Sequence, residues 1–276
     1  MLCGYSKIKP PTTVYRSGIA EWDDEASEFR QVNDFPPDAP LFPDGQSLLY
    51  QDGDIKYVYF ATPFPLVRTK ANAENYRDLS SYEAYTCLKP GSTLKQPEID
   101  RDEVGRVRYA WKRGTPPVGP REQAKLVREG KLSADEGLIR LCDVATGQEV
   151  LAHAGSVNWN EYRKRFVMIA VQIYGSSFLG EVWYAEAPTP VGPWKSTVKI
   201  ATHDKYSFYN PKQHPYFDQQ GGRIIYFEGT YSHTFSGNDH PTPRYDYNQI
   251  MYRLDLADER LTEFKTQESG LRSQRP

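Results

Sequence analysis

The stretch FDQQGGRIIYF, residues 217–227, predicts how this chain folds, because its pattern occurs twice more in the sequence. In it, five mostly polar or turn-forming residues separate an aromatic residue from a basic one, and four apolar or aromatic residues follow. The same pattern is present in YQDGDIKYVYF, residues 50–60, and in WNEYRKRFVMI, residues 159–169. Each copy is typical of a strand, a hairpin turn and a second strand. The chain is therefore predicted to repeat one antiparallel unit.

A third strand is expected after each hairpin, and the middle unit has a candidate fourth strand. These segments are YEAYTCL from Tyr82, GEVWYAEA from Gly180, NQIMYRLDL from Asn248 and, as the fourth strand, WKSTVKIATH from Trp194. Four-stranded antiparallel units repeated around an axis are the pattern of a β-propeller, which has about 4–8 blades. We therefore expect an all-β propeller of which about three and a half blades are present, the partial one near the N-terminus.

The spacing of the repeats is interrupted by residues 89–150. Within this segment, PREQAKLVREGKLSADEGLIRLCD, residues 120–143, has an amphipathic pattern that predicts one or two short helices. We interpret residues 89–150 as an insertion with short helices in one blade. Residues 1–276 are then expected to form a single propeller domain that starts in mid-blade and is N-terminally incomplete.

The composition argues against several partners. The net charge of −2 gives no basis for binding nucleic acid or an anionic membrane surface. No apolar stretch approaches the roughly 20 residues of a membrane-spanning helix, and the N-terminal residues lack the apolar segment of a signal peptide. Cys3, Cys87 and Cys142 show neither metal-ligand spacing nor a disulfide framework. The sequence favours a soluble protein and leaves its localisation open.

Three residues are predicted to be catalytic because blade geometry directs them to one face of the propeller. Glu228 follows the apolar run RIIYF, where a carboxylate needs a partner or a function. His214 lies between two prolines that favour an extended chain, and it could act as a base, a hydroxyl partner or a metal ligand. Glu181 of the middle blade is expected to converge with Glu228 on the same face.

Polar and aromatic residues that blade geometry directs to the same face are predicted to bind the ligand. They are Tyr209, Asn210, Gln213, Tyr231, Arg244, Tyr245 and Asp246 of the last blade, and Asn158 and Gln172 of the middle blade. Structural alternatives exist for the central residues. Glu228 could form an ion pair with Arg223, Arg244 or Arg253, and His214 could be a hydrogen-bonded spacer between blades.

A divalent metal near His214 and Glu228 would need further ligands, such as His233 and His240. The spacing of these residues matches no known ligand signature. We therefore expect no cofactor.

The segment VWYAEAPTPVGPW, residues 182–194, resembles the link between the third and fourth strands of five-bladed propeller glycosidases. More closely, SVNWNEYRKRFVMIAVQ, YSFYNPKQHP and PRYDYNQIMYRLDL are similar to bacterial propeller proteins of the domain-of-unknown-function 4185 group. This resemblance implies five blades, some of them upstream of Met1. In the glycosidase clans an essential carboxylate comes from the first blade. The resemblance thus implies that a nucleophile or base can be absent from this chain.

The leading functional hypothesis is a carbohydrate-active, glycoside hydrolase-like propeller. Its two carboxyl groups would lie about 5–5.5 Å apart for retention or about 6.5–9.5 Å apart for inversion. Glu228 would be the acid, and Glu181 the base or orienting group. One alternative is a non-catalytic glycan- or protein-binding propeller, and another is a polysaccharide lyase that uses His214 with Tyr209 or Tyr231.

The sequence leaves open the substrate, the linkage, whether there is turnover and which stereochemical course it follows. Exposed edge strands would also favour self-association.

Overall fold

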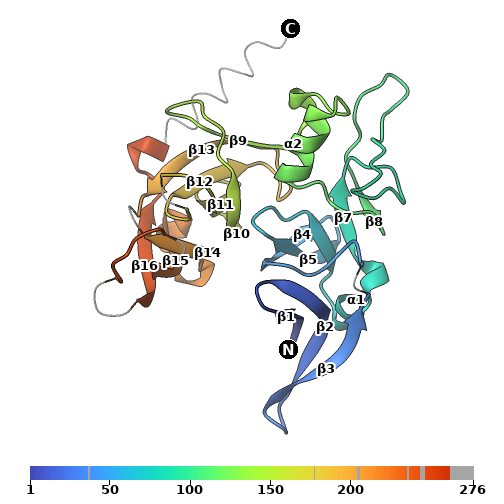
Figure 1. Ribbon diagram of the computed structural model, residues 1–276, viewed down its shortest axis with the longest axis horizontal. Coiled ribbons are helices and arrows are strands. Elements are labelled where there is room, and N and C mark those ends of the chain that lie inside the picture. Colours follow the sequence, from blue (N-terminus) through green and yellow to red (C-terminus); the bar gives the residue numbers. More distant parts are fainter. Residues whose placement is uncertain (37, 177, 204–205, 235, 243–245, 262–276) are drawn as a thin grey trace. The chain divides into compact units, whose positions relative to one another are not determined.

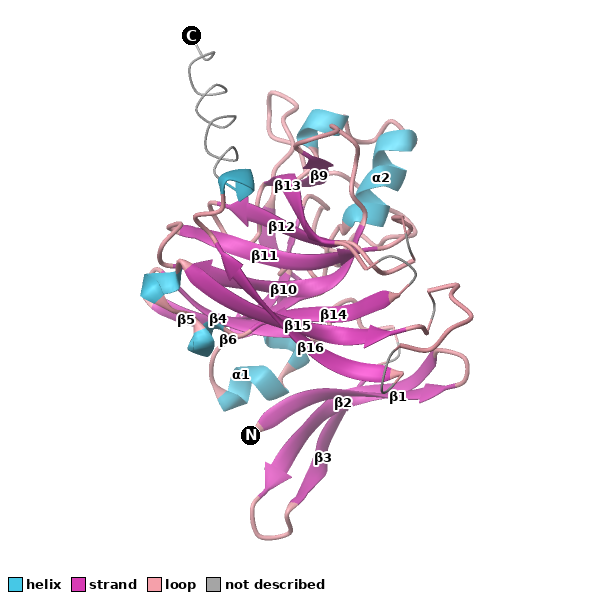
Figure 2. Cartoon of the chain, turned by 90° about the vertical axis from the view of Figure 1, so that its left-hand side faces the viewer, coloured by secondary structure: helices cyan, strands magenta, loops and turns pink. Residues whose placement is uncertain are grey.

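The computed structural model describes residues 1–36, 38–176, 178–203, 206–234, 236–242 and 246–261. Strands predominate and the helices are short (Figure 2). The chain forms two compact units, one of residues 1–60 and 65–136, the other of residues 61–64 and 137–276, and each contains two sheets (Figure 1). The predicted all-β class, with sheets of the kind that form propeller blades, is confirmed.

The first unit contains a three-stranded and a five-stranded sheet. The former is made of β1 (Leu2–Lys9), β2 (Thr13–Asp23) and β3 (Glu28–Phe35), all antiparallel. The latter has the order β4 (Gln46–Asp52), β5 (Ile55–Ala61), β6 (Val67–Lys70), β7 (Glu83–Thr86) and β8 (Ala110–Arg113). The segment from Tyr82 was expected to be the third strand but supplies the fourth, because Val67–Lys70, with its β-branched residues, pairs in between.

The second unit also contains a five-stranded and a three-stranded sheet. The former has the order β10 (Ala152–Asn160), β11 (Arg165–Gln172), β12 (Val182–Ala187), β13 (Trp194–Ala201) and β9 (Ile139–Asp143). The latter is formed by β14 (Ser207–Gln213), β15 (Ile224–Ser232) and β16 (Tyr247–Asp255). The strands predicted from Gly180, Trp194 and Asn248 are confirmed.

The sheets have three or five strands rather than the predicted four. The two larger sheets gain an edge strand each, β8 and β9, from residues 89–150. Strand β9 is parallel to β13, whereas the other strand pairs of unit 2 are antiparallel. The segment that we interpreted as an insertion therefore also completes the sheets. The expected single domain and self-association through edge strands stay predictions.

One or two short helices were predicted in residues 120–143, and the structure has α2 (Pro120–Arg128) and the 3-10 helix η2 (Ala134–Glu136) there. Helix α2 starts at a proline, whose fixed φ and missing N–H suit the first turn. Its Leu126 is buried with Cys87, Leu88, Val118 and Leu132. Unit 1 contains a further short helix, α1 (Ala73–Arg77). None of the helices in the described ranges has the length and apolarity that a membrane span requires.

Phe217 departs from the predicted repeat. Tyr50 and Trp159 lie in strands, as expected, but Phe217 lies in the 3-10 helix η3 (Pro215–Phe217) and is 47% exposed. Pro215 has no N–H for a sheet ladder, and its φ suits the first position of a helix. The chain therefore leaves β14 at Gln213 and makes a turn before β15.

The core of unit 2 lies between its two sheets. Its buried members are Val167, Ile169, Val182, Tyr184, Val198, Phe208, Ile225, Phe227, Leu254, Leu256 and Leu261. Ile225 is 0% exposed. This core fixes one face of the β14–β16 sheet and leaves its other face to solvent.

We expect Ile225→Ala to lower the free energy of unfolding by about 2–5 kcal/mol, because it leaves a cavity in this core. Urea denaturation of the purified protein measures the change. The matched control is Ile8→Ala, since Ile8 is 57% exposed on β1, and its cost should stay below about 1 kcal/mol. Equal losses for the two variants would contradict the placement of the core.

Candidate functional site

His214, the residue after β14, lies between a phenol and a carboxylate. Its backbone N–H donates to the Tyr226 carbonyl at 2.9 Å, which fixes it beside β15. Its Nδ1 is hydrogen-bonded to the hydroxyl of Tyr216, and its Nε2 lies 2.8 Å from Oε1 of Glu228. The histidine is only 7% exposed. Two residues that the sequence singled out, His214 and Glu228, are therefore in contact.

The contact between His214 and Glu228 is close but poorly directed, since the buried Nε2 makes no well-angled hydrogen bond with any described residue. The two atoms nevertheless lie 2.8 Å apart, within hydrogen-bonding distance. When the Tyr216 hydroxyl donates to Nδ1, the proton of the neutral imidazole resides on Nε2 and faces the carboxylate. His214 thus connects a phenol to Glu228.

Glu228 lies in the middle of β15, not at its end as expected. It pairs with Lys212 on β14 and Met251 on β16. Because Ile225 and Phe227 point into the core, the alternate residues of β15 point away from it. We call the resulting surface the outer face of β14–β16, formed by Tyr209, Lys212, Tyr226, Glu228, Thr230, Gln249, Met251 and Arg253. All eight are exposed or half-buried.

The structural alternative for Glu228, an ion pair with an arginine, is not found among the described residues. Arg223 instead donates two hydrogen bonds of 2.9 Å to Asp255. Arg244 lies outside the described residues. The carboxylate of Glu228 is 27% exposed and keeps one side open to solvent.

Two aromatic rings are exposed next to His214. Tyr216 is 73% and Phe217 47% exposed. Their rings meet edge to face with centroids 4.7 Å apart, and the Phe217 ring is 5.9 Å from that of His214. Flat apolar surface beside a few convergent polar groups is a common property of ligand sites.

A β-bulge at Asn210 and Pro211 determines which residues share the face of Glu228. Tyr209 pairs with Thr230, yet Lys212 pairs with Glu228, so one extra residue is inserted. Asn210 accommodates this with φ of 50°, a left-handed conformation that asparagine tolerates. A regular ladder would place Lys212 opposite the buried Phe227. The bulge therefore places Lys212 on the outer face and Gln213 on the inner one.

Gln213 is buried, at 2% exposure, on the core side of the sheet. Its backbone N–H donates to Ser156 Oγ at 2.8 Å, and its Nε2 lies 3.4 Å from Asp218 Oδ2. Gln213 Oε1 and Asp218 Oδ1 are buried and have no hydrogen-bond partner among the described residues. Burial raises the pKa of Asp218 to about 6, although the hydrogen bond from Gln213 opposes this. Sequence reasoning missed Asp218, because the local sequence does not reveal the partial burial that raises its pKa.

Asn158, predicted to bind the ligand, faces the turn that carries these groups. Alternate residues of β10 share one side of the strand. From that side Ser156 accepts the Gln213 N–H, and Asn160 Nδ2 donates to the Gly222 carbonyl at 2.8 Å. Asn158 lies between them and therefore faces residues 213–222.

Glu181 belongs to a separate cluster, so the expected convergence with Glu228 is not found. Glu181 is 0% exposed just before β12, and its Oε1 accepts the Ser176 hydroxyl. Its Oε2 has no hydrogen-bond partner among the described residues, and a Cβ on Gly175 would come within 2.2 Å of it. The carboxylate is sealed by its own loop, whereas that of Glu228 is on the solvent side of another sheet. Gln172 accepts the Trp183 Nε1–H at 2.8 Å.

Tyr231 and Tyr209, also predicted to bind the ligand, contact other aromatic rings. Tyr231 packs against Tyr206 and His203. Tyr209 is 39% exposed, and its ring is 6.0 Å from that of His153.

Asp246 is hydrogen-bonded to His233, which lowers the pKa of Asp246. Tyr245, like Arg244, lies outside the described residues. Throughout the described ranges, no three His, Cys, Asp or Glu side chains are grouped to hold a metal ion.

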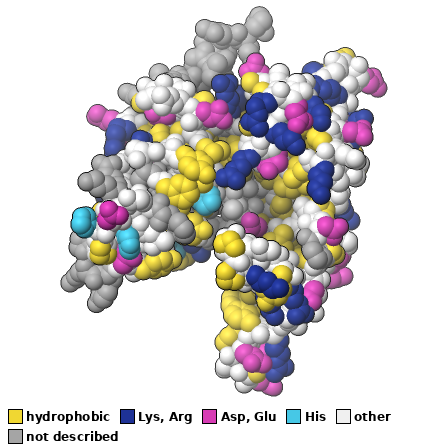
Figure 3. All heavy atoms as spheres, viewed as in Figure 1, with side chains coloured by type: hydrophobic (Ala, Val, Ile, Leu, Met, Phe, Trp, Pro, Cys, Tyr) yellow, Lys and Arg dark blue, Asp and Glu magenta, His cyan; other side chains and the backbone are white. Residues whose placement is uncertain are grey.

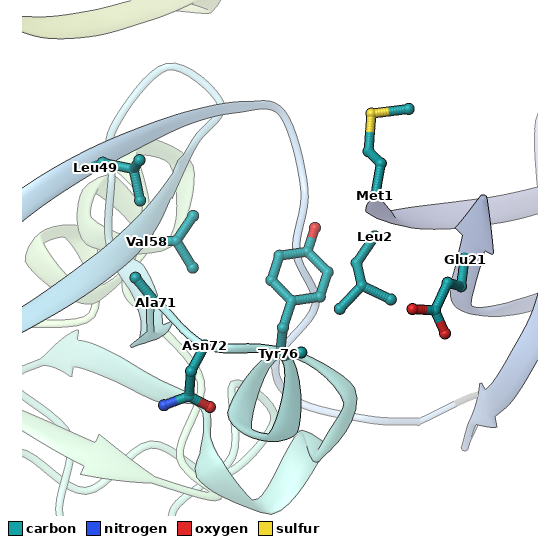
Figure 4. Close-up of a pocket in the computed structure, with 9 residues that line it drawn as sticks. Met1, Leu2, Glu21, Leu49, Val58, Ala71, Asn72 and Tyr76 are labelled. Carbon is teal, nitrogen blue, oxygen red and sulfur yellow. The ribbon is translucent and has the colours of Figure 1, made fainter. Parts of the chain in front are cut away.

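Unit 1 contains a pocket of about 420 Å³, drawn in Figure 4. It is lined by Met1, Leu2, Glu21, Leu49, Val58, Ala71, Asn72, Ala73 and Tyr76. Glu21 is the single charged residue of this lining, and it is paired with Arg77 at 2.6 Å. The pocket therefore suits an apolar group but lacks the acid and base of a reaction site.

On the face drawn in Figure 3, acidic and basic side chains are interspersed.

The likeness of this chain to solved structures is distant. No protein-family model and no curated protein sequence matches this chain. A solved structure of exo-β-1,3-galactanase from Phanerochaete chrysosporium with β-1,3-galactotriose is similar over 85% of this chain, at 11% identity and a TM-score of 0.28. The match covers 41% of that chain, so the present chain spans about two fifths of its length. At this identity and TM-score the likeness carries no argument about function.

The raised pKa of Asp218 has a consequence for stability. Because ionisation is disfavoured in the folded state, stability decreases as the pH rises from about 4 to about 6. Asp218→Asn removes this cost. We expect the variant to gain stability over the wild type at pH 8 but not at pH 4. Denaturant titrations at both pH values measure it, with Asp54→Asn at an exposed turn as the control for lost charge. The same difference at both pH values would contradict the raised pKa of Asp218.

Proposed function

We propose that this chain is a carbohydrate-active protein whose ligand binds on the outer face of β14–β16 around His214. The observation that supports this most directly is the Tyr216–His214–Glu228 contact. It combines a buried imidazole, an accessible phenol and a half-open carboxylate at a surface with exposed aromatic rings. Aromatic rings offer stacking surface to sugar rings, and the polar groups offer hydrogen bonds to hydroxyls.

Hydrolysis by two converging carboxylates, the leading expectation from the sequence, is not what the described geometry favours. That reaction needs both groups within about 10 Å of each other around the scissile bond. Glu181 is sealed in its own cluster. Asp218 binds Gln213 on the opposite side of the hairpin from Glu228. Glu228 instead has an imidazole as its neighbour.

A second candidate function, polysaccharide elimination, is favoured by the hydrogen bond between His214 and Tyr216. His214 accepts the phenol proton, with the developing imidazolium stabilised by Glu228, as a carboxylate does in other proton relays. The phenolate then removes the proton α to the carboxylate of a uronate. A C4=C5 double bond forms, the C4–O bond breaks, and the leaving oxygen receives a proton from the imidazolium or phenol. The tyrosine is Tyr216, not Tyr209 or Tyr231.

We expect Glu228→Gln and His214→Ala each to abolish binding or turnover on a panel of neutral and acidic glycans, without loss of the folded state. Both changes remove a group at the ligand surface and leave the core intact. Calorimetry measures binding, and thermal melting reports folding. Glu25→Gln, at an exposed turn of unit 1, is the matched control.

Products then separate the reaction classes. New reducing ends without ultraviolet absorbance indicate hydrolysis, an unsaturated uronate indicates elimination, and neither indicates a binding protein. If Glu228→Gln unfolds the chain while His214→Ala leaves glycan binding unchanged, these residues are structural.

Tyr216→Phe tests the elimination chemistry separately from binding. The variant keeps the exposed ring and loses the hydroxyl on His214. We expect turnover of a uronate polymer to drop by a factor of about 10²–10⁴, as for loss of a general acid–base group, with little change in affinity. Tyr174→Phe, at another 70% exposed tyrosine, is the control. An unchanged elimination rate in Tyr216→Phe would exclude this role.

A further inference from the structure

We infer that the ligand is an acidic, uronate-containing glycan whose carboxylates are bound by Lys212 and Arg253. This inference rests on the proposed function of the outer face and names the chemical class of its ligand. It stands on the strand register around Glu228 and on the ion pairs that surround that face.

The register brings both cations next to Glu228. Lys212 is its direct partner on β14, where cross-strand Cβ atoms lie about 4.5–5.5 Å apart. Arg253 pairs with Tyr226, two residues before Glu228, which makes it a diagonal neighbour at about 7–8 Å. Both cations are exposed. They therefore flank the carboxylate on two sides of the same surface.

No ion pair joins Lys212 or Arg253 to a carboxylate of the described residues, although Arg253 is close enough to Asp255 to help lower the pKa of that carboxyl. Lys212 lies opposite Glu228 on the neighbouring strand. The close contact of the Glu228 carboxylate, however, is made by its Oε1 with His214. Asp255, the acidic residue closest in sequence to Arg253, is held by two hydrogen bonds from Arg223. The three cations Lys212, Arg223 and Arg253 lie around two carboxylates, those of Glu228 and Asp255, and leave this part of the outer face with a positive excess, although the whole chain has a net charge of −2.

A local positive excess beside exposed aromatic rings suits a sugar that carries a carboxylate. Lys212 or Arg253 would bind that carboxylate, while Tyr216 and Phe217 offer stacking surface. For elimination, neutralising the uronate carboxylate also makes the neighbouring C–H more acidic. The bulge at Asn210 has a direct consequence here, because without it Lys212 would face the core.

The test uses polygalacturonate and the same polymer with its carboxylates methyl-esterified, so that backbone and linkage are constant. We expect the wild type to bind polygalacturonate at least about tenfold more tightly than the ester at low salt, with the difference shrinking as ionic strength rises. Lys212→Gln combined with Arg253→Gln should remove that difference. Lys195→Gln combined with Arg140→Gln removes two exposed cations from the neighbouring sheet and is the matched control.

Four results separate the inference from the proposed function. If only the Lys212/Arg253 variant loses the preference for polygalacturonate over its ester, both the inference and the proposed function are supported. If the wild type binds the acid and the ester equally and His214→Ala abolishes this binding, the inference is overturned and the proposed function is kept. Acid binding that survives both His214→Ala and Glu228→Gln but needs Lys212 and Arg253 overturns the proposed site. A wild type that binds neither polymer nor any other glycan of the panel overturns both.

Discussion

The packing of the β14–β16 sheet on the β10–β13 strands is the constraint on which the candidate site depends. Phe208 of β14 lies against Gly229 of β15, where a Cβ would come within 2.5 Å of its ring. The side chains of Phe208, Ile225 and Phe227 fill the space between the sheets. Since interiors are close-packed, this contact stabilises the observed placement of the smaller sheet. Its outer face is defined as a result.

Polar anchors then fix the turn between β14 and β15. Ser156 binds one end of it and Asn160 the other, so that residues 213–222 are held at both ends by β10. Beyond the turn, Arg163 forms a buried ion pair with Glu186 and donates to the Leu261 carbonyl at 3.0 Å. Removing one partner of such a pair costs about 3–5 kcal/mol because it leaves a buried charge uncompensated. His214 is thus presented by a rigid support.

The two sides of this turn have different chemistry. The core side has acceptor atoms of Gln213 and Asp218 that find no partner in the described part of the chain, and burial raises the pKa of Asp218 to about 6. The solvent side has the phenol, the imidazole and the carboxylate of the proposed site. A single bulge at Asn210 separates the two sides. It places Lys212 on the solvent side and Gln213 on the core side, and in a regular strand the two residues would lie the other way round. The chemistry of the site therefore depends on one inserted residue.

The sequence alone determined the class of fold and the pair at the centre of the candidate site. The spacing of aromatic and basic residues predicted the hairpins, since strand and turn propensities are local. His214 and Glu228 were singled out because each is unusual in its local context. The five-bladed family and the catalytic roles stay proposals.

Tertiary structure alone decided that Glu181 is sealed away, that Tyr216 is the tyrosine at His214, and that Oδ1 of Asp218 is buried. These features depend on a bulge that changes which side chains point to each face of the sheet. They also depend on contacts with strands more than fifty positions away in the sequence, such as the strand of Ser156. Neither the bulge nor these long-range contacts produce a pattern in the local sequence.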